Sequence, residues 1–184
     1  MDILFLCTGN ICRSPMGEAY LRRRLLELGE TPRVHSAGLR ADGLEPARGA
    51  VEVLGAEGLD VSAHRSRRMT EAMLEEADLV VCMAREHLKE AVVLHPPAWP
   101  RTFTLKELVR RAEDVGARAQ GQPFDEWLDK VHAGRTRTEL LGDSTVDDVA
   151  DPIGRPPEMF ERTAREIAAL IDRLVDLGWR EATR

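Results

Sequence analysis

Two short, continuous apolar runs constrain the fold of this chain more than any other feature of its sequence. The first covers Ile3–Cys7 and the second covers Asp78–Met83, where one aspartate precedes five apolar residues. Unbroken runs of this length are typical of strands that are buried on both faces of a parallel sheet. Each run is followed by a segment with helical character, so an α/β fold is expected.

The rest of the chain alternates further strands with helices. A helix is predicted to begin at Ser14 and Pro15, a cap residue and a proline at the first helical position, and to end at Gly29. The last helix, Pro156–Gly178, carries apolar residues at steps of three and four: Phe160, Ala164, Ile167, Ile171 and Leu174. Shorter segments complete the pattern, with strands at 33–37 and 101–104 and helices at 46–57, 71–77 and 85–93. The alternation predicts a four-stranded parallel sheet with helices on both faces.

The 184 residues are expected to form a single domain. A chain of this length buries about two thirds of the surface that its unfolded form exposes, so its core needs no disulfide or metal. Between about residues 110 and 149 the pattern changes to Gly, Gln, Asp and Arg, with one helix expected at 124–131. This stretch lacks the apolar residues for a core of its own, and it is predicted to be a surface insertion.

Charge and cysteine content exclude several classes of protein. The chain carries 26 Lys and Arg residues against 32 Asp and Glu residues, so neither nucleic acid nor an anionic membrane is expected as a partner. Three cysteines without a Cys-x-x-Cys pair, and five scattered histidines, predict neither a disulfide framework nor a metal site. No apolar run is long enough for a signal peptide or a membrane span, and a cytoplasmic location is expected.

The segment from Cys7 to Ser14 joins the first strand to the first helix and contains the residues best suited to chemistry. A loop at this position directs several backbone N–H groups and the positive end of the helix dipole at one point. Gly9 and Asn10 tolerate the left-handed backbone that such a loop needs to surround an anion. Arg13 can bind a phosphate with two parallel hydrogen bonds. The N–H groups, the helix dipole and Arg13 together favour a thiolate at Cys7. These parts predict a phosphate site with a nucleophile at its floor, where Ser14 donates to the thiolate and also caps the helix.

Attack of a thiolate on a phosphoester expels an alkoxide or phenoxide, which needs a proton. Asp151 is the candidate acid because it lies in a rigid Asp-Pro turn before the last helix, expected at the same edge of the sheet as the Cys7 loop. Two plainer interpretations stay open at this point. Asp-Pro is a common way to start a turn, and Cys7, Arg13 and Ser14 can equally be a buried strand residue, a solvated charge and a helix cap.

Four segments together resemble bacterial members of the low-molecular-weight protein tyrosine phosphatase family. They are residues 7–15 (CTGNICRSP) with Met16, residues 35–38, residues 77–83 and the late pair 151–152. The resemblance extends over nearly the whole chain, with about residues 110–149 outside it. It implies a phosphatase I-like three-layer α/β/α fold and hydrolysis of a phosphorylated protein or a small aryl phosphate through a phosphocysteine intermediate. The implied product is inorganic phosphate, and no cofactor is needed.

The resemblance also assigns roles to single residues. It implies that Cys7 is the nucleophile, that Arg13 binds the transferring phosphoryl group and that Asp151 is the acid that later acts as base for water. The implied phosphate-binding loop consists of Thr8, Gly9, Asn10, Ile11, Cys12 and Ser14. Ser36 and His64 match the hydrogen-bonded group that supports this loop, although an ordinary strand-end serine and a surface histidine look the same in sequence.

The substrate pocket departs from the family pattern. Phosphotyrosine-directed members usually place one aromatic residue in the loop after the second strand and one directly after Asp-Pro. Here the loop Leu39–Gly49 has no aromatic residue, and Ile153 follows the Asp-Pro pair. Phe124 and Trp127 in the expected insertion are candidates for a replacement wall, and the alternative is that they anchor the insertion to the body of the protein.

Two alternative functions concern the same phosphate site. Residues 102–107 and 151–154 are similar to the protein-arginine phosphatase branch of the superfamily. That branch has a threonine where this chain has Ile11, and a bulky apolar residue favours an aryl ring over a guanidinium. Arginine dephosphorylation therefore ranks second, and a phosphate-binding module without catalysis ranks below it.

Two further hypotheses concern the remaining cysteines. Arsenate reductases that use internal thiols need two more cysteines about seven residues apart, but only Cys82 is present and position 89 is a lysine. Arsenate reduction would therefore require an external thiol. Cys12 lies five residues from Cys7 and is a candidate redox partner that would capture an oxidised Cys7 as a disulfide.

Overall fold

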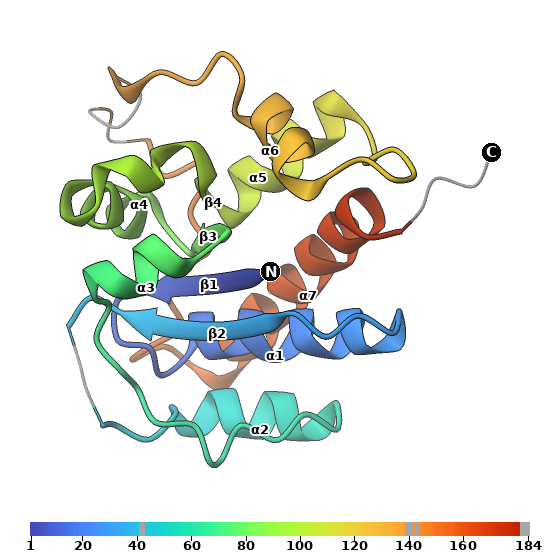
Figure 1. Ribbon diagram of the computed structural model, residues 1–184. Helices are drawn as coiled ribbons and strands as arrows, with labels where there is room; N and C mark the ends of the chain where they lie inside the picture. Colours follow the sequence, from blue (N-terminus) through green and yellow to red (C-terminus); the bar gives the residue numbers. More distant parts are fainter. Residues whose placement is uncertain (41–42, 139–141, 143, 181–184) are drawn as a thin grey trace.

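The computed structural model describes residues 1–40, 43–138, 142 and 144–180, and its centre is a four-stranded sheet (Figure 1). The strands are β1 (Asp2–Cys7), β2 (Arg33–Gly38), β3 (Leu79–Cys82) and β4 (Thr102–Thr104), in the spatial order β2-β1-β3-β4. Each neighbouring pair is parallel. The predicted four-stranded parallel sheet is confirmed, and its strands all end at the same edge.

The two continuous apolar runs form the two central strands. β1 lies between β2 and β3, with Ile3 opposite Leu79 and Leu6 opposite Cys82. All four residues of β3 and all but the first residue of β1 are buried. Both faces of these strands are covered by helices, which explains why their sequences do not alternate between apolar and polar residues.

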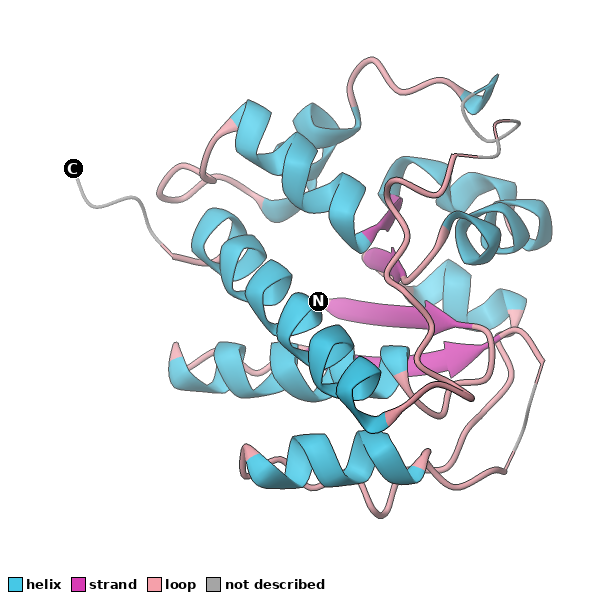
Figure 2. Cartoon of the chain, turned by 180° about the vertical axis from the view of Figure 1, so that it is seen from behind, coloured by secondary structure: helices cyan, strands magenta, loops and turns pink. Residues whose placement is uncertain are grey.

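Helices on both faces of the sheet make a three-layer α/β/α arrangement (Figures 1 and 2). One side comprises α1 (Arg13–Glu27), α2 (Arg48–Ala56), α5 (Leu105–Val115), α6 (Phe124–His132) and α7 (Pro157–Gly178). The other side comprises α3 (Glu71–Glu76), α4 (Arg85–Leu94) and the 3₁₀ helix η1 (Pro96–Arg101). Across the described part of the chain, no helix combines the length and the apolar character needed to cross a membrane.

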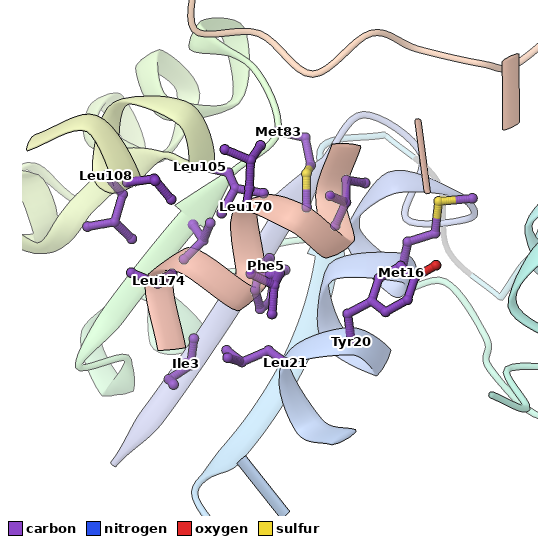
Figure 3. Packing of buried hydrophobic residues seen from close by; sticks show 14 of the residues in the cluster. Ile3, Phe5, Met16, Tyr20, Leu21, Met83, Leu105, Leu108, Leu170 and Leu174 are labelled. Atoms are coloured by element: carbon purple, nitrogen blue, oxygen red, sulfur yellow. The ribbon is translucent and has the colours of Figure 1, made fainter. Parts of the chain in front are cut away.

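Alternating side chains along β1 divide the core into two clusters. The odd-numbered residues Ile3 and Phe5 pack with α1 and α7, and the even-numbered residues pack with α3 and α4. Figure 3 shows Phe5 in the first cluster among side chains from both helices. Gly17 allows α1 to approach β1 closely, because a Cβ at this position would lie 2.7 Å from both Phe5 and Met83.

The segment from residue 105 to 132 differs from the predicted surface insertion. It forms α5, a helix that the sequence analysis does not include, and the predicted α6. Three apolar residues of α6 are buried in the main core cluster: Trp127, Leu128 and Val131. Helix α6 needs no core of its own because it completes the core formed with α5 and α7. Residues 139–141 and 143 of the expected insertion, and residues 41 and 42 of the loop after β2, lie outside the described residues.

A signal for α5 is present in the sequence. Thr104 caps the helix, since its hydroxyl oxygen accepts a hydrogen bond from the backbone N–H of Glu107. The residues that this helix buries follow helical spacing: Leu105, Leu108, Val109 and Ala112. A threonine followed three residues later by glutamate, with apolar residues at steps of three and four, is a helix-start pattern.

One buried guanidinium joins the segment after α6 to the rest of the fold. Arg135 pairs with Glu107, with Nε 2.8 Å from Oε1, and lies 4.0 Å from the ring centres of both Trp99 and Phe103. It also donates to the backbone carbonyl oxygens of Trp99 and Thr102. Arg135 therefore links this segment to η1, β4 and α5.

Candidate active site

The loop of residues 8–12 connects β1 to α1 at the carboxyl edge of the sheet. Asn10 takes a left-handed backbone conformation with a φ of 51°, as the loop prediction requires. Gly38, the last residue of β2, permits a close approach, because a Cβ there would lie 2.9 Å from Asn10 N and from Thr8 O. The backbone N–H of Leu39 also donates to Thr8 O at 2.9 Å. The end of β2 thus supports the loop from one side.

Cys7 is the last residue of β1 and is 2% exposed. Two donors are directed at its sulfur, the backbone N–H of Asn10 at 3.2 Å and the hydroxyl of Ser14 at 3.0 Å. Such donors suit a thiolate, because hydrogen bonds to a charged acceptor are the stronger kind. Ser14 lies inside α1, whose N-cap is Cys12, and none of the described side chains caps this helix. The predicted bond from Ser14 to sulfur is confirmed, and the predicted cap is wrong because the hydroxyl is directed at Cys7 instead.

The side chain of Asn10 connects the loop to three other segments. Its Nδ2 donates to Ser36 Oγ at 2.8 Å and to Ser14 Oγ at 3.0 Å. Its Oδ1 accepts from the backbone N–H of Arg67 at 2.9 Å, and its backbone oxygen lies 2.7 Å from His64 Nε2. The structure therefore brings Ser36 and His64, two of the residues singled out in the sequence, to the loop.

These hydrogen bonds run in one direction. Because Nδ2 can only donate, both serine hydroxyl oxygens accept from it and are free to donate onward. Ser36 donates to Glu18 Oε2 at 2.6 Å, and Ser14 donates to Cys7 Sγ, with Ala37 O a more distant acceptor at 3.4 Å. The Asn10 amide thus helps to orient the Ser14 hydrogen toward the sulfur.

Arg13 lies at the start of α1 and is 5% exposed. Its Nη1 donates to Val149 O at 3.1 Å, and its Nη2 donates to Asp151 Oδ2 at 2.7 Å and to Thr8 Oγ1 at 3.4 Å. The Asp151 side chain is 45% exposed, and its other oxygen accepts from the backbone N–H of Ile153 at 3.1 Å. The predicted position of Asp151 beside the Cys7 loop is confirmed.

A contact that the sequence analysis does not predict reaches the loop from α4. The Thr8 hydroxyl oxygen lies 3.0 Å from Nε2 of His87, which is 1% exposed. Burial and the nearby positive charge of Arg13 lower the pKa of His87 to about 3. Nothing in the sequence near His87 distinguishes it from the other four histidines.

The other two cysteines are buried thiols. Burial, together with the neighbouring Cys7, raises the pKa of Cys12, and burial raises that of Cys82. Cys82 lies opposite Leu6 in the sheet and belongs to the other core cluster, so it and Cys7 lie on opposite faces. The redox partnership of Cys12 with Cys7 stays a prediction, which peptide mapping after mild peroxide treatment would test.

Within the described ranges, no three His, Cys, Asp or Glu side chains are grouped to hold a metal ion.

The two aromatic residues proposed as a replacement pocket wall lie elsewhere. Trp127 is 1% exposed and its Nε1 donates to Gly116 O at 3.0 Å. Phe124 packs against Trp127 and Trp179, with ring centres 5.5 and 5.0 Å apart. It also lines a cavity with Met1, at the opposite edge of the sheet from Cys7. The hypothesis of a replacement wall is therefore wrong, and both residues anchor α6 to the body of the protein.

Comparison with known proteins assigns this arrangement to a family. The family model described as "Low molecular weight phosphotyrosine protein phosphatase" matches residues 2–133. The chain belongs to this phosphatase family. The match runs from β1 through α6 and passes residue 110, where the resemblance seen in the sequence lapses. The protein is therefore an enzyme of the cysteine-dependent phosphatase class.

Individual relatives of this phosphatase family differ in their named activities. The chain is 36% identical over 133 residues to "Probable low molecular weight protein-tyrosine-phosphatase EpsP" from Ralstonia solanacearum, covering 72% of this chain and 89% of that protein. It is 33% identical over 175 residues to a "Protein-arginine-phosphatase" from Geobacillus stearothermophilus, covering 95% and 93%. The solved structure of a low molecular weight protein tyrosine phosphatase from T. tengcongensis is similar with a TM-score of 0.70 and 35% identity, covering 96% and 98%. The expected three-layer phosphatase fold is confirmed.

Proposed function

We propose that the protein hydrolyses phosphotyrosine through a covalent intermediate on Cys7, with Arg13 and Asp151 as the other catalytic residues. One observation carries this proposal. Arg13 donates both to Thr8, the residue after Cys7, and to Asp151, so nucleophile, cation and acid meet at one edge of the sheet. Membership of the phosphatase family supports the reaction class, and the contacts support the division of roles.

In the first step the Cys7 thiolate attacks phosphorus. The S–P bond forms and the P–O bond to the aryl group breaks, while Asp151 in its acid form protonates the leaving phenolate oxygen. An acid that acts on a protein substrate must be reachable from solvent, and the Asp151 side chain is 45% exposed. The nucleophile is shielded in comparison, since Cys7 is 2% exposed.

In the second step a water molecule attacks the phosphocysteine. The Asp151 carboxylate accepts a proton from the water, the new P–O bond forms and the S–P bond breaks. Inorganic phosphate leaves and the Cys7 thiolate is restored. In this scheme the protein's own side chains handle each bond and proton, so the reaction proceeds without a cofactor.

Arg13 supplies a fixed positive charge in both steps. A guanidinium donates parallel hydrogen bonds to phosphoryl oxygens and stabilises the charge that develops on them in the transition state. Before substrate binds, contacts with Val149 O and Asp151 Oδ2 hold the guanidinium at the loop. When the phosphoryl group arrives, it replaces Asp151 at the guanidinium, while the contact with Val149 O can stay and keep Arg13 oriented.

Phosphotyrosine ranks first as substrate because of Ile11 in the loop. The Ile11 backbone oxygen accepts from the backbone N–H of Ala47 at 2.7 Å, so the residue is fixed relative to the start of α2. Its partly exposed side chain offers an aryl ring an apolar contact and offers a guanidinium no hydrogen bond. The exposed Ile153, next to the acid, adds a second apolar side chain.

Phosphoarginine is the second candidate substrate. The similarity to the arginine phosphatase covers 95% of this chain, including residues beyond 133 that the family model does not match. A self-contained arsenate reductase has less support. Cys82 is buried on the face of the sheet away from Cys7, so it is not placed to resolve an oxidised Cys7 without an external thiol.

Hydrolysis of p-nitrophenyl phosphate tests the proposed enzyme. Cys7→Ser should abolish turnover, and Cys82→Ala, which alters another buried cysteine at a strand end, should retain it. Circular dichroism of both variants controls for folding. If the unaltered protein does not hydrolyse the ester, a phosphate-binding module without catalysis is the better description.

Paired kinetics on phosphotyrosine and phosphoarginine peptides test the substrate. The unaltered protein should prefer phosphotyrosine by at least about tenfold in kcat/KM, and Ile11→Thr should shift the ratio toward phosphoarginine. Val93→Thr, an exposed apolar position on α4, is the matched control. A preference of the unaltered protein for phosphoarginine would make the second candidate correct.

We further propose that residues 1–184 act as one phosphatase domain whose partners are phosphorylated proteins. The packing of α5, α6 and α7 into one core cluster supports this organisation. Trapping of phosphoproteins from lysate with Asp151→Ala would identify the physiological substrate. The double variant Cys7→Ala, Asp151→Ala is the control for phosphate-independent capture.

A further inference from the structure

His87 of α4 touches the phosphate-binding loop but has no part in the two-step scheme. Its Nε2 lies 3.0 Å from Thr8 Oγ1, and the residue is 1% exposed. Its Nδ1 is buried and has no hydrogen-bond partner among the residues that the structure describes. A buried polar atom without a partner is uncommon and calls for an explanation.

The missing partner of Nδ1 favours one form of the ring. If Nδ1 carried the proton, a buried N–H would have no acceptor, and such orphaned donors are rare in folded proteins. If Nε2 carries the proton, Nδ1 presents only a lone pair, and the proton is donated to Thr8 Oγ1. The ring is neutral, since burial and Arg13 lower the pKa of His87 to about 3. The Nε2–H form is therefore the expected one.

This form fixes the hydrogen bonds of Thr8. A threonine hydroxyl has one hydrogen to donate and two lone pairs that accept. One lone pair accepts from His87 Nε2, and the other accepts from Arg13 Nη2 at 3.4 Å. Neither neighbour can take the hydroxyl hydrogen, so that hydrogen is available for a group bound beside Arg13.

We propose that His87 is a positioning residue that directs the Thr8 hydroxyl hydrogen at the phosphoryl group, which makes Thr8 a substrate-binding donor. The inference rests on the proposed function, because the group bound beside Arg13 is taken to be a phosphate. It adds α4, from the opposite helical layer, to the elements that build the phosphate site. Without His87, the hydroxyl can rotate and donate to other acceptors, and the donor is no longer preorganised.

Long-range ¹H–¹⁵N spectra of the histidine rings test the ring form directly. His87 should give the shifts of a neutral ring protonated at Nε2 between about pH 5 and 8, with its resonances assigned by loss of signal in His87→Gln. A ring protonated at Nδ1 would overturn the proposal. This measurement uses the unaltered, folded protein and does not depend on turnover.

Binding of inorganic phosphate, measured by calorimetry, tests the consequence. Thr8→Val and His87→Leu should each weaken phosphate binding about tenfold, the loss expected for one hydrogen bond to a charged group. KM for p-nitrophenyl phosphate should rise to the same extent while kcat changes less than about threefold, because the donor serves bound substrate and transition state alike. His87→Gln, whose amide N–H can replace Nε2–H, should restore much of the affinity.

A double variant separates positioning from a general loss of structure. If His87 acts through Thr8, the pair Thr8→Val, His87→Leu should bind phosphate no more weakly than Thr8→Val alone. His132→Leu, at a histidine of α6 that packs against Trp99 and Phe103, is the control and should leave phosphate binding unchanged. Unchanged phosphate binding in either Thr8→Val or His87→Leu, or multiplicative losses in the pair, would overturn the proposal. The proposed function fails on a different result, the retention of hydrolysis by Cys7→Ser.

Discussion

Asn10 combines two properties at the residue scale that few side chains offer together. Its backbone is left-handed, with a φ of 51°, and asparagine tolerates this conformation better than most residues with a Cβ. Its amide reaches Ser14, Ser36 and the backbone of Arg67. Glycine would provide the conformation without the contacts, and alanine would provide neither.

The comparison of Asn10→Gly with Asn10→Ala separates these two properties. Both variants should lose most activity, because the Ser14 hydroxyl is no longer directed at Cys7 by the amide. Asn10→Ala should in addition be less stable than Asn10→Gly by about 1 kcal/mol, the cost of a left-handed residue with a Cβ. Urea unfolding measures the difference, and equal stabilities would show that the left-handed conformation is not retained in solution.

Asp151 is the second residue whose role is open to a direct test. If it protonates the leaving group, Asp151→Asn should reduce turnover of phenyl phosphate by at least about a hundredfold, the usual contribution of a general acid. The loss on p-nitrophenyl phosphate should be much smaller, since p-nitrophenolate needs little protonation to leave. Steady-state kinetics on the two esters measure this contrast. Equal losses on both would remove Asp151 from the acid role.

At the scale of elements, Arg135 shows how one residue joins the α5–α6 region to the sheet. Its side chain is fully buried, paired with Glu107 and stacked between Trp99 and Phe103. A buried ion pair contributes little net stability over an apolar pair, but loss of one partner leaves a buried charge. The connection is therefore sensitive to substitution on either side.

Arg135→Met should destabilise the protein by about 3 kcal/mol, because the Glu107 carboxylate loses its partner in a buried setting. Arg135→Lys should not restore stability, since an ammonium group cannot stack between two rings and donate in several directions. The exposed pair of Arg48 with Glu52 on α2 provides the control, and Arg48→Met should change stability by less than about 0.5 kcal/mol. Urea unfolding measures the free energy of unfolding of the three variants. A loss below about 1 kcal/mol in Arg135→Met would contradict this account.

At the scale of the whole molecule, buried and half-buried histidines make stability depend on pH. Burial, as the main cause, lowers the pKa of His35, His87 and His132, in His87 to about 3 from the ordinary 6.5. Below pH 6.5 the unfolded chain binds protons that the folded protein does not, so the free energy of unfolding falls as the pH falls. This contribution is fully present above pH 6.5 and is lost progressively toward pH 3 for His87.

The free energy of unfolding should therefore decrease between about pH 7 and pH 4.5, with His87 contributing up to about 1.4 kcal/mol per pH unit. His87→Gln, which does not titrate, should show a shallower decrease over the same interval. Urea unfolding at several pH values measures both slopes. Identical slopes for the two proteins would mean that His87 is not held neutral in the folded state.

Much of the fold could be predicted from local sequence. The two apolar runs show strands covered on both faces, and the stripe along α7 shows a helix with one buried side. The loop around Cys7 could also be recognised, because its left-handed residue and its arginine lie within seven positions of the cysteine. Helix α5 also carries a local signal, the Thr104 cap followed by apolar residues at steps of three and four.

Strand periodicity, loop conformation and helix start are properties of a few consecutive residues. The sequence by itself therefore determined the strands of the sheet, the Cys7 loop and Arg13 as the candidate phosphate ligand. The partners of that loop depend on packing across the molecule. Glu18 meets Ser36, His87 meets Thr8 and Val149 meets Arg13 across 18, 79 and 136 positions of the chain. A hydrogen bond across such a separation leaves no periodic trace, because its two ends are brought together by the core and not by local propensity. Folding alone assigned Trp127 to the core and His87 to the phosphate loop.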